Sequence, residues 1–325
     1  MLAILLWALP HVHLLATGGT IAGGSGKNLD ARELAQLVPG LSEVASLTLE
    51  DFTSLGSSRM TPEIQLKLAK RVNELFDGDT SLASIVITHG TDSLEETAFF
   101  VDLLLAHERP VVFAAAQRPP REVDSDGPRN LLNALRIATS PGARGMGVLV
   151  TLNNEIHAAR DVRKTHAVAL DAFKSPEAGP VGYVDGQSVH FMRTPLRRVR
   201  LKTESVEPRV DLLTLVAGAD GRLVRAAVET GARGIVLEVF GRGNVPPPVM
   251  DQVRYAREKD AVVVFTTRTR GGRVEISQEA RDMGVISGED LDGIKARTLL
   301  VVALGHTKDL ARIQSYFEEL SGKPR

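Results

Sequence analysis

Short apolar runs that end at turns of small residues most constrain the fold of this 325-residue chain. Residues 12–16, apolar apart from His13, form one such run, which is followed by two glycines at positions 18 and 19. Residues 84–88 form another run, which leads into the polar stretch 89–93. Each run has the length of a buried strand, and apolar residues at helical spacing follow the second run. Because alternating buried strands and helices are typical of parallel sheets covered by helices, we expect an α/β protein.

The length exceeds the usual size of a single hydrophobic core, so we expect two domains. A larger amino-terminal open-sheet domain is predicted over residues 1–192, and a smaller carboxy-terminal parallel-sheet α/β domain over residues 212–325. The linker between them, residues 193–211, has charges and prolines where periodic apolar residues would otherwise stand. The smaller domain is expected to hold strands at residues 212–216, 234–240, 261–266 and 299–303.

The net charge and the absence of cysteine exclude several kinds of binding partner and of chemistry. The formal net charge is -1, which offers no broad basic field for nucleic acid or an anionic membrane. The basic run at residues 197–202 is interpreted as a solvated surface. No cysteine is present, so disulfides and a cysteine nucleophile are excluded. The apolar start, residues 1–10, is too short to span a membrane, and we expect a cytoplasmic protein; a mis-assigned start codon would leave periplasmic export open.

Glycine-rich loops invite a phosphate-binding interpretation, which the sequence does not support. A P-loop needs lysine followed by serine or threonine, and here Lys27 precedes Asn28. No dinucleotide fingerprint begins at the first glycine pair, and no histidine cluster has metal-ligand spacing. We therefore expect no metal and no cofactor. His89 follows a strand and is a candidate base or ligand, or a buried structural histidine.

Hydroxyl residues stand at the carboxyl ends of both expected strands. Thr20 follows the first strand, and Thr91 and Asp92 follow the second at the start of a helix. In addition, Ser93 and Glu96 have the spacing of a capping box. Ligands of open α/β sheets bind outside the carboxyl ends of the strands, so the two loops are candidates for one pocket. Such turns also join strands to helices where no site exists.

A threonine hydroxyl needs a base to become a nucleophile near neutral pH. A lysine serves as that base when burial or nearby positive charge lowers its pKa, whereas an acidic partner positions the lysine and raises its pKa. Thr91, Asp92 and Lys164 supply these three residue types. Their spacing in the sequence does not show whether they converge.

Two stretches resemble the signatures of a known family. Residues 16–23, Ala-Thr-Gly-Gly-Thr-Ile-Ala-Gly, and residues 88–97, Thr-His-Gly-Thr-Asp-Ser-Leu-Glu-Glu-Thr, are similar to the two motifs of bacterial-type L-asparaginases. The likeness extends over nearly the whole chain from Pro10, through residues 56–57, 126–128, 158–165, 287–288 and 295–297.

The resemblance implies hydrolysis of the side-chain amide of L-asparagine to L-aspartate and ammonia through a threonyl acyl-enzyme, with L-glutamine as a second substrate. Carried over by motif, Thr20 is the primary nucleophile, and Thr91, Asp92 and Lys164 form the associated triad. The backbone N–H of Thr91 is implied to contribute to the oxyanion hole, which agrees with its place at a helix start.

The resemblance also implies a substrate-binding set and shared active sites. Ser57 and Asp92 would hold the α-carboxylate and the α-amino group, while Ser58 stands where the family commonly has glutamine. Asn244 matches one of the residues that a neighbouring subunit contributes in this family, and Glu275 aligns approximately with another, which implies a homodimer or homotetramer. Residues 23–34 contain no tyrosine, although the family's loop there usually carries one that contacts the nucleophile.

Two other functions compete with this hypothesis. The related subunit of a tRNA-dependent amidotransferase normally carries an added amino-terminal domain, and we expect none of that size before Pro10. A non-catalytic amino-acid-binding or sensing protein would keep the pocket with a compromised lid. The retained threonines at positions 20 and 91, with Asp92 and Lys164, favour the enzyme.

Overall fold

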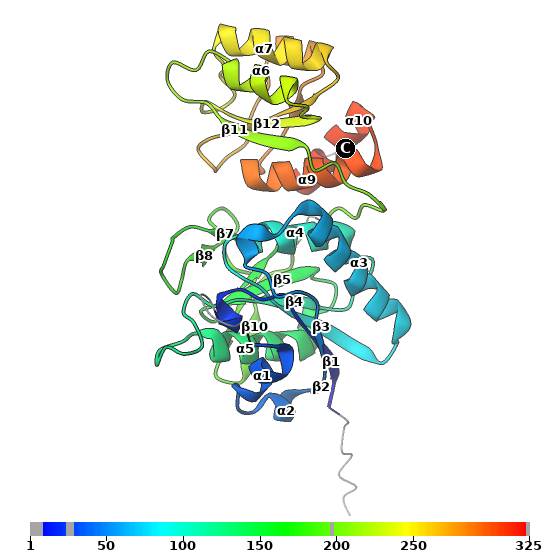
Figure 1. The fold of residues 1–325 in the computed structure, drawn as a ribbon, viewed down its shortest axis with the longest axis vertical. Coiled ribbons are helices and arrows are strands. Elements are labelled where there is room, and N and C mark those ends of the chain that lie inside the picture. Colours follow the sequence, from blue (N-terminus) through cyan, green and yellow to red (C-terminus); the bar gives the residue numbers. More distant parts are fainter. Residues whose placement is uncertain (1–8, 24–28, 196–197, 323–325) are drawn as a thin grey trace, which may run out of the picture. The chain divides into compact units, whose positions relative to one another are not determined.

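The computed structural model describes residues 9–23, 29–195 and 198–322. Contacts divide the chain into two compact units, residues 1–60 with 67–195 and residues 61–66 with 196–325. Each unit is a sheet with helices packed on it (Figure 1), which confirms the predicted α/β class. The domain boundaries predicted around residues 193–211 stay a prediction, since compact units are not thereby independently folding domains.

The first unit is built on an eight-stranded sheet in the order β10-β9-β6-β5-β4-β3-β1-β2. Its strands are β1 (His11–Ala16), β2 (Ser46–Asp51), β3 (Leu82–Thr88), β4 (Val111–Ala114), β5 (Val148–Leu152), β6 (Glu155–Ala158), β9 (Gly182–Asp185) and β10 (Ser188–Phe191). Strands β1 to β5 pair in parallel, and β6, β9 and β10 extend the sheet in antiparallel fashion. Strands β9 and β10 are joined directly as an antiparallel hairpin.

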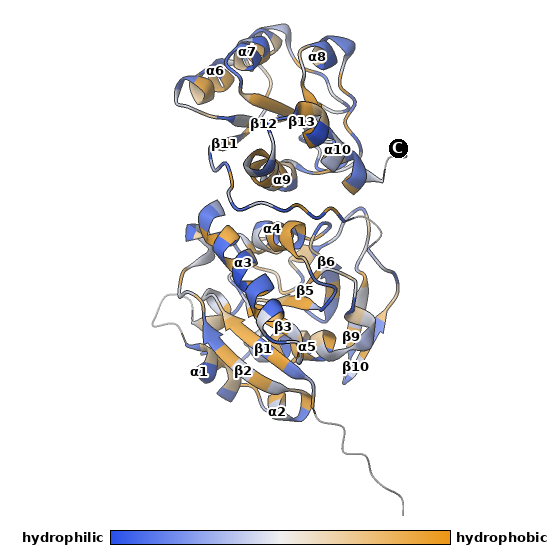
Figure 2. Ribbon diagram, turned by 90° about the vertical axis from the view of Figure 1, so that its right-hand side faces the viewer, coloured by the Kyte–Doolittle hydropathy of each residue, from blue (hydrophilic) through white to orange (hydrophobic). Residues whose placement is uncertain are grey.

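Helices cover both faces of this sheet. They are α1 (Ala31–Gln36), α2 (Leu41–Val44), α3 (Pro62–Gly78), α4 (Leu94–Leu104) and α5 (Gly127–Thr139), with 3-10 turns η1 (Thr20–Ala22), η2 (Ser57–Arg59) and η3 (Pro141–Ala143). Figure 1 shows α1, α2 and α5 on one side of the sheet and α3 and α4 on the other. Alternate residues of a strand face opposite sides, so a strand buried on both faces is largely apolar, as the mainly orange colour of β3 shows in Figure 2.

The second unit holds the four-stranded parallel sheet β11-β12-β13-β14. Its strands are β11 (Val210–Thr214), β12 (Gly234–Val239), β13 (Val262–Thr267) and β14 (Ile286–Ser287). Its helices are α6 (Arg222–Glu229), α7 (Pro247–Glu258), α8 (Gln278–Asp282), α9 (Gly293–His306) and α10 (Leu310–Ser321). A smaller parallel sheet is confirmed, and three of its four strands lie where the sequence predicted them.

The fourth predicted strand is wrong. Residues 299–303 lie inside α9, and the actual fourth strand is the two-residue β14. The helix begins after Asp292, whose side chain accepts the N–H of Lys295, and most of its residues are buried. A short apolar run does not distinguish a strand from a helix that is buried on most sides, and this helix has no polar face to mark its period.

Some predicted features fall outside the described residues. These features are residues 1–8 of the apolar start, Lys27 and Asn28 of the loop tested as a P-loop, and Arg197 of the basic run. Among the described residues, every helix is too short or too polar to cross a bilayer.

Candidate active site

Three loops meet at the carboxyl ends of adjacent parallel strands. β1 lies between β2 and β3 in the sheet. The loop after β1 carries Thr20, the loop after β2 carries Ser57, and the loop after β3 carries Thr91. Main-chain hydrogen bonds tie the loops together: the N–H of Thr17 donates to the carbonyl of Thr88 at 3.1 Å, and the N–H of Leu55 donates to the carbonyl of Thr17 at 3.3 Å. The predicted convergence of the two threonine loops at one sheet edge is thereby confirmed.

Glycines allow these loops to touch. Gly19 has a φ of +88°, and a Cβ there would overlap the backbone of Gly90. A Cβ on Gly90 would in turn lie 2.5 Å from Ser57 Oγ, and one on Gly18 would lie 2.6 Å from the carbonyl oxygen of Leu55. Because any larger residue would force the backbones apart, the glycines are what brings the three loops into direct contact.

Thr91 and Lys164 form the shortest polar contact between side chains of the predicted triad. Lys164 Nζ donates to Thr91 Oγ1 at 2.8 Å and lies 3.9 Å from Asp92 Oδ1. Thr91 is buried, whereas the Asp92 side chain is 62% exposed. The structure thus brings the three residues together, with the carboxylate of Asp92 at the solvent side. An amine within hydrogen-bond distance of a hydroxyl is arranged to exchange a proton with it.

Thr20 opens the 3-10 turn η1, directly after Gly19. It is half-buried, and in the part of the chain that the structure describes its hydroxyl has no hydrogen-bond partner. The backbone N–H of Thr91 likewise donates to no acceptor among the described residues, and it stands just before α4. A free N–H at a helix start is suited to a negatively charged oxygen.

The two predicted serines have different surroundings. Ser57 is buried, and its Oγ accepts the N–H of Asp92 at 3.1 Å. Its carbonyl accepts the hydroxyl of Ser93 at 2.6 Å. This bond corrects the predicted capping box: Ser93 is the N-cap residue of α4, but its hydroxyl is turned to Ser57 and caps no N–H of the helix. Ser58 is exposed, so of the two serines Ser57 is the one built into the site.

His89 has the surroundings of a structural histidine. It is fully buried, and its Nδ1–H donates to the carbonyl of Gly90 at 2.7 Å. Burial lowers the pKa of His89 to about 4, although the bond to Gly90 and the charge of Asp92 act in the opposite direction. A neutral ring that holds the peptide between residues 90 and 91 fixes the loop that presents Thr91, which favours the structural interpretation over a base or ligand.

Two carboxylates at this site were not singled out from the sequence. Glu95 Oε2 accepts the backbone N–H of Lys164 at 2.7 Å. Asp126 accepts the backbone N–H groups of Gln117 and Arg118, which shapes the loop after β4. Both residues belong to motifs noted in the sequence, residues 88–97 and 126–128, but neither was assigned a role there, because an acid in the first turn of a helix or in a loop is common.

Asn244 and Glu275 lie in the second unit on neighbouring loops. The backbone N–H of Glu275 donates to the carbonyl of Arg242 at 2.7 Å. The side chains of Arg242 and Glu275 also form an ion pair at 2.5 Å. Gly243 permits this approach, because a Cβ there would overlap the carbonyl of Glu275. The structure therefore brings the loops of Asn244 and Glu275 together.

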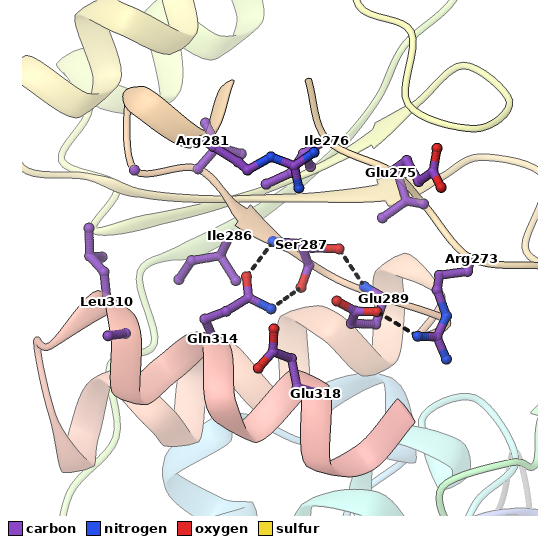
Figure 3. A pocket seen from close by; sticks show the side chains of 14 residues that line it. Arg273, Glu275, Ile276, Arg281, Ile286, Ser287, Glu289, Leu310, Gln314 and Glu318 are labelled. Carbon is purple, nitrogen blue, oxygen red and sulfur yellow. Dashed lines mark hydrogen bonds and ion pairs between the residues drawn. The ribbon is translucent and has the colours of Figure 1, made fainter. Parts of the chain in front are cut away.

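The second unit also contains a cavity of about 490 Å³ beside β14 and α10 (Figure 3). Some of its polar groups are paired with one another. The amide of Gln314 contacts both the N–H and the carbonyl of Ser287, and Arg273 forms an ion pair with Glu289 at 3.1 Å. Gln314 thus satisfies the backbone of Ser287 on the edge strand. Among the described residues no three histidine, aspartate or glutamate side chains are grouped to hold a metal ion.

The fold and site define a two-unit α/β protein whose threonine and lysine side chains meet at the carboxyl ends of parallel strands. Comparison of the sequence with models of known protein families identifies the family of the chain. The model "Asparaginase, N-terminal" matches residues 11–197, and the model "Glutaminase/Asparaginase C-terminal domain" matches residues 209–317. The chain belongs to the asparaginase family.

Individual relatives agree over almost the full length. L-asparaginase 2 of Bacillus subtilis is 37% identical over 96% of this chain and 87% of that protein. L-asparaginase 2 of Escherichia coli is 35% identical over 96% of this chain and 94% of that protein. A glutaminase-asparaginase of Pseudomonas fluorescens is 35% identical over 96% of this chain and 91% of that protein. The crystal structure of a probable cytoplasmic L-asparaginase from Campylobacter jejuni superposes with a TM-score of 0.89 at 36% identity, over 95% of this chain and 99% of that one.

Proposed function

We propose that the protein hydrolyses the side-chain amide of L-asparagine, giving L-aspartate and ammonia. The observation that supports this most is the 2.8 Å contact between Lys164 Nζ and Thr91 Oγ1, beside the loop that carries Thr20. It combines a hydroxyl, an amine that can exchange a proton with it and a helix start in one place, which is what cleavage of an amide requires. Relatives at 35–37% identity are named L-asparaginases.

The proposed chemistry runs through a threonyl ester. Thr20 Oγ1 attacks the amide carbon and loses its proton, and the carbonyl oxygen becomes negative next to the Thr91 N–H. The amide nitrogen takes up a proton and leaves as ammonia. Water then attacks the ester carbon, which releases aspartate and returns the proton to Thr20. Lys164 and Thr91 are proposed to relay protons in both halves of the reaction.

The substrate's charged groups are proposed to select a free amino acid. Ser57 would hydrogen-bond the α-carboxylate, and Asp92 would pair with the α-ammonium group; Ser58 would line the carboxylate side without a long side chain. Activity on L-glutamine is proposed as a side reaction, since the relative from Pseudomonas fluorescens is a glutaminase-asparaginase. One additional methylene changes binding by only about 1–3 kcal/mol.

Asn244 and Glu275 are proposed to complete the site of a neighbouring subunit in a homodimer or homotetramer. Light scattering combined with activity at decreasing concentration tests this: activity should fall as the oligomer dissociates, and a fully active monomer would contradict it. The cytoplasmic location stays a prediction, because the relatives include both a probable cytoplasmic and a probable periplasmic enzyme.

Ammonia release from L-asparagine by the purified protein, together with calorimetric binding of L-asparagine, tests the function. The proposal expects both binding and steady release. Binding without ammonia release would instead support the amino-acid-sensing alternative.

A further inference from the structure

The catalytic candidate Lys164 lies on a segment that the main sheet does not hold. It is the second residue of β7 (Arg163–Lys164), which, among the described strands, pairs only with β8 (Phe173–Lys174) and forms a separate two-stranded ribbon. A ribbon of this length is marginally stable by itself. The position of Lys164 relative to Thr91 therefore depends on contacts outside the ribbon.

Glu95 provides such a contact. Its Oε2 accepts the backbone N–H of Lys164 at 2.7 Å, and the residue is only 8% exposed. It lies in the first turn of α4, where the unpaired N–H groups of the helix stabilise a carboxylate. A hydrogen bond to an ionised acceptor is shorter and stronger than one between neutral groups.

Thr91 and Glu95 lie four positions apart at the same helix start. Lys164 therefore makes two contacts with this segment: its Nζ contacts the hydroxyl of Thr91, just before α4, and its backbone N–H contacts the carboxylate of Glu95, in the first turn of α4. Two attachment points fix both the position of the Lys164 backbone and the reach of its side chain.

We propose that Glu95 is a positioning residue, which holds the backbone of Lys164 so that Nζ stays within hydrogen-bond distance of Thr91. The expected effect of Glu95 on turnover rests on the proposed function, whereas its effect on the position of the Lys164 backbone does not. The inference extends the predicted triad by a residue that contacts no reacting atom.

Amide hydrogen exchange of Lys164 tests the geometric part without any turnover. In Glu95→Ala the protection of this N–H should fall at least about tenfold, since its acceptor is gone. In Glu95→Gln most of the protection should remain, because the side-chain amide oxygen still accepts. Equal protection of the Lys164 N–H in wild type and Glu95→Ala would overturn the inference.

Steady-state kinetics test the catalytic part. Glu95→Ala should lower kcat for L-asparagine about tenfold or more and leave KM within about threefold, because the substrate does not contact Glu95. Glu95→Gln should restore most of kcat. Glu95→Asp, which keeps the charge but withdraws the carboxylate by one methylene, should fall between the two and serves if the alanine variant does not fold.

The matched control is Glu96→Ala, which removes the neighbouring acid from the same helical turn and should keep kcat near the wild-type value. Wild-type kcat in both Glu95→Ala and Glu95→Asp, or an equal loss in Glu96→Ala, would refute the positioning role. A wild-type protein that releases no ammonia would refute the proposed function instead, and the exchange experiment would still decide the role of Glu95.

Discussion

Replacing Lys164 with methionine isolates one amine in the proposed mechanism. Lys164 Nζ lies 2.8 Å from Thr91 Oγ1 and 3.9 Å from Asp92 Oδ1, and the lysine side chain is 20% exposed. Methionine keeps a long unbranched stem for packing but neither donates nor accepts a proton at that place. The backbone N–H that contacts Glu95 is unchanged, so the segment should stay in position.

The two expected effects differ greatly in size. A positioned acid or base contributes about 10²–10⁴ to the rate, so kcat should fall by that factor, which corresponds to about 3–5 kcal/mol in the barrier. The lost hydrogen bond contributes only about 0.5–1.5 kcal/mol to the free energy of unfolding. KM should change little, because the amine is not proposed to bind the substrate.

Ammonia release and thermal unfolding measure the two effects on the same samples. Lys67→Met, which changes an exposed lysine on α3, is the matched control and should behave as wild type. A folded Lys164→Met protein with kcat within about threefold of wild type would refute the role of the amine.

The remaining predictions concern the loops around the site. Gly19→Ala should destabilise the protein by at least about 2 kcal/mol, since its φ of +88° and the close backbone of Gly90 both exclude a Cβ; an unchanged unfolding temperature would contradict the loop packing. His89 should make stability depend on pH, because the unfolded state binds its proton below pH 6.5 and the folded state only near the pKa of about 4. The free energy of unfolding that depends on neutral His89 is fully present above pH 6.5, falls as the pH falls, and is lower by about 3 kcal/mol at pH 4. When the free energy of unfolding is measured with urea from pH 7 to 4, it should depend less on pH in His89→Gln than in wild type. The same pH dependence in both proteins would contradict this prediction. Ser57→Ala should raise KM for L-asparagine about tenfold or more, with a smaller effect on kcat, since a hydrogen bond to a charged group contributes about 1.5–3 kcal/mol; an unchanged KM would remove Ser57 from the proposed substrate-binding set.

Much of the fold could be predicted from local patterns. Buried strands such as β1 and β3 are recognisable because both faces are covered, so that apolar residues follow one another, and because glycines end the runs. The same patterns placed Thr20 and Thr91 at strand ends. The helix α9 was mistaken in part for a strand, since burial on most sides removes the polar face that marks a helix.

The contacts of Lys164 depend on tertiary structure and could not be predicted from spacing. The lysine lies 73 positions from Thr91 and 69 from Glu95 along the chain, on a two-residue strand with no periodic pattern. Ser93 illustrates the converse: its spacing from Glu96 fits a capping box, but a carbonyl from another loop accepts its hydroxyl instead. Local sequence does not reveal a competing partner that the fold brings near.

The central claim is that Thr20 carries the reaction, and one comparison tests it most directly. Ammonia release from L-asparagine is measured for wild type, Thr20→Ala and Thr20→Ser, each shown to be folded by its unfolding temperature. The account predicts that alanine lowers kcat by about 10³-fold or more while serine, which keeps the hydroxyl, retains measurable turnover. A folded Thr20→Ala protein that releases ammonia at the wild-type rate would contradict it.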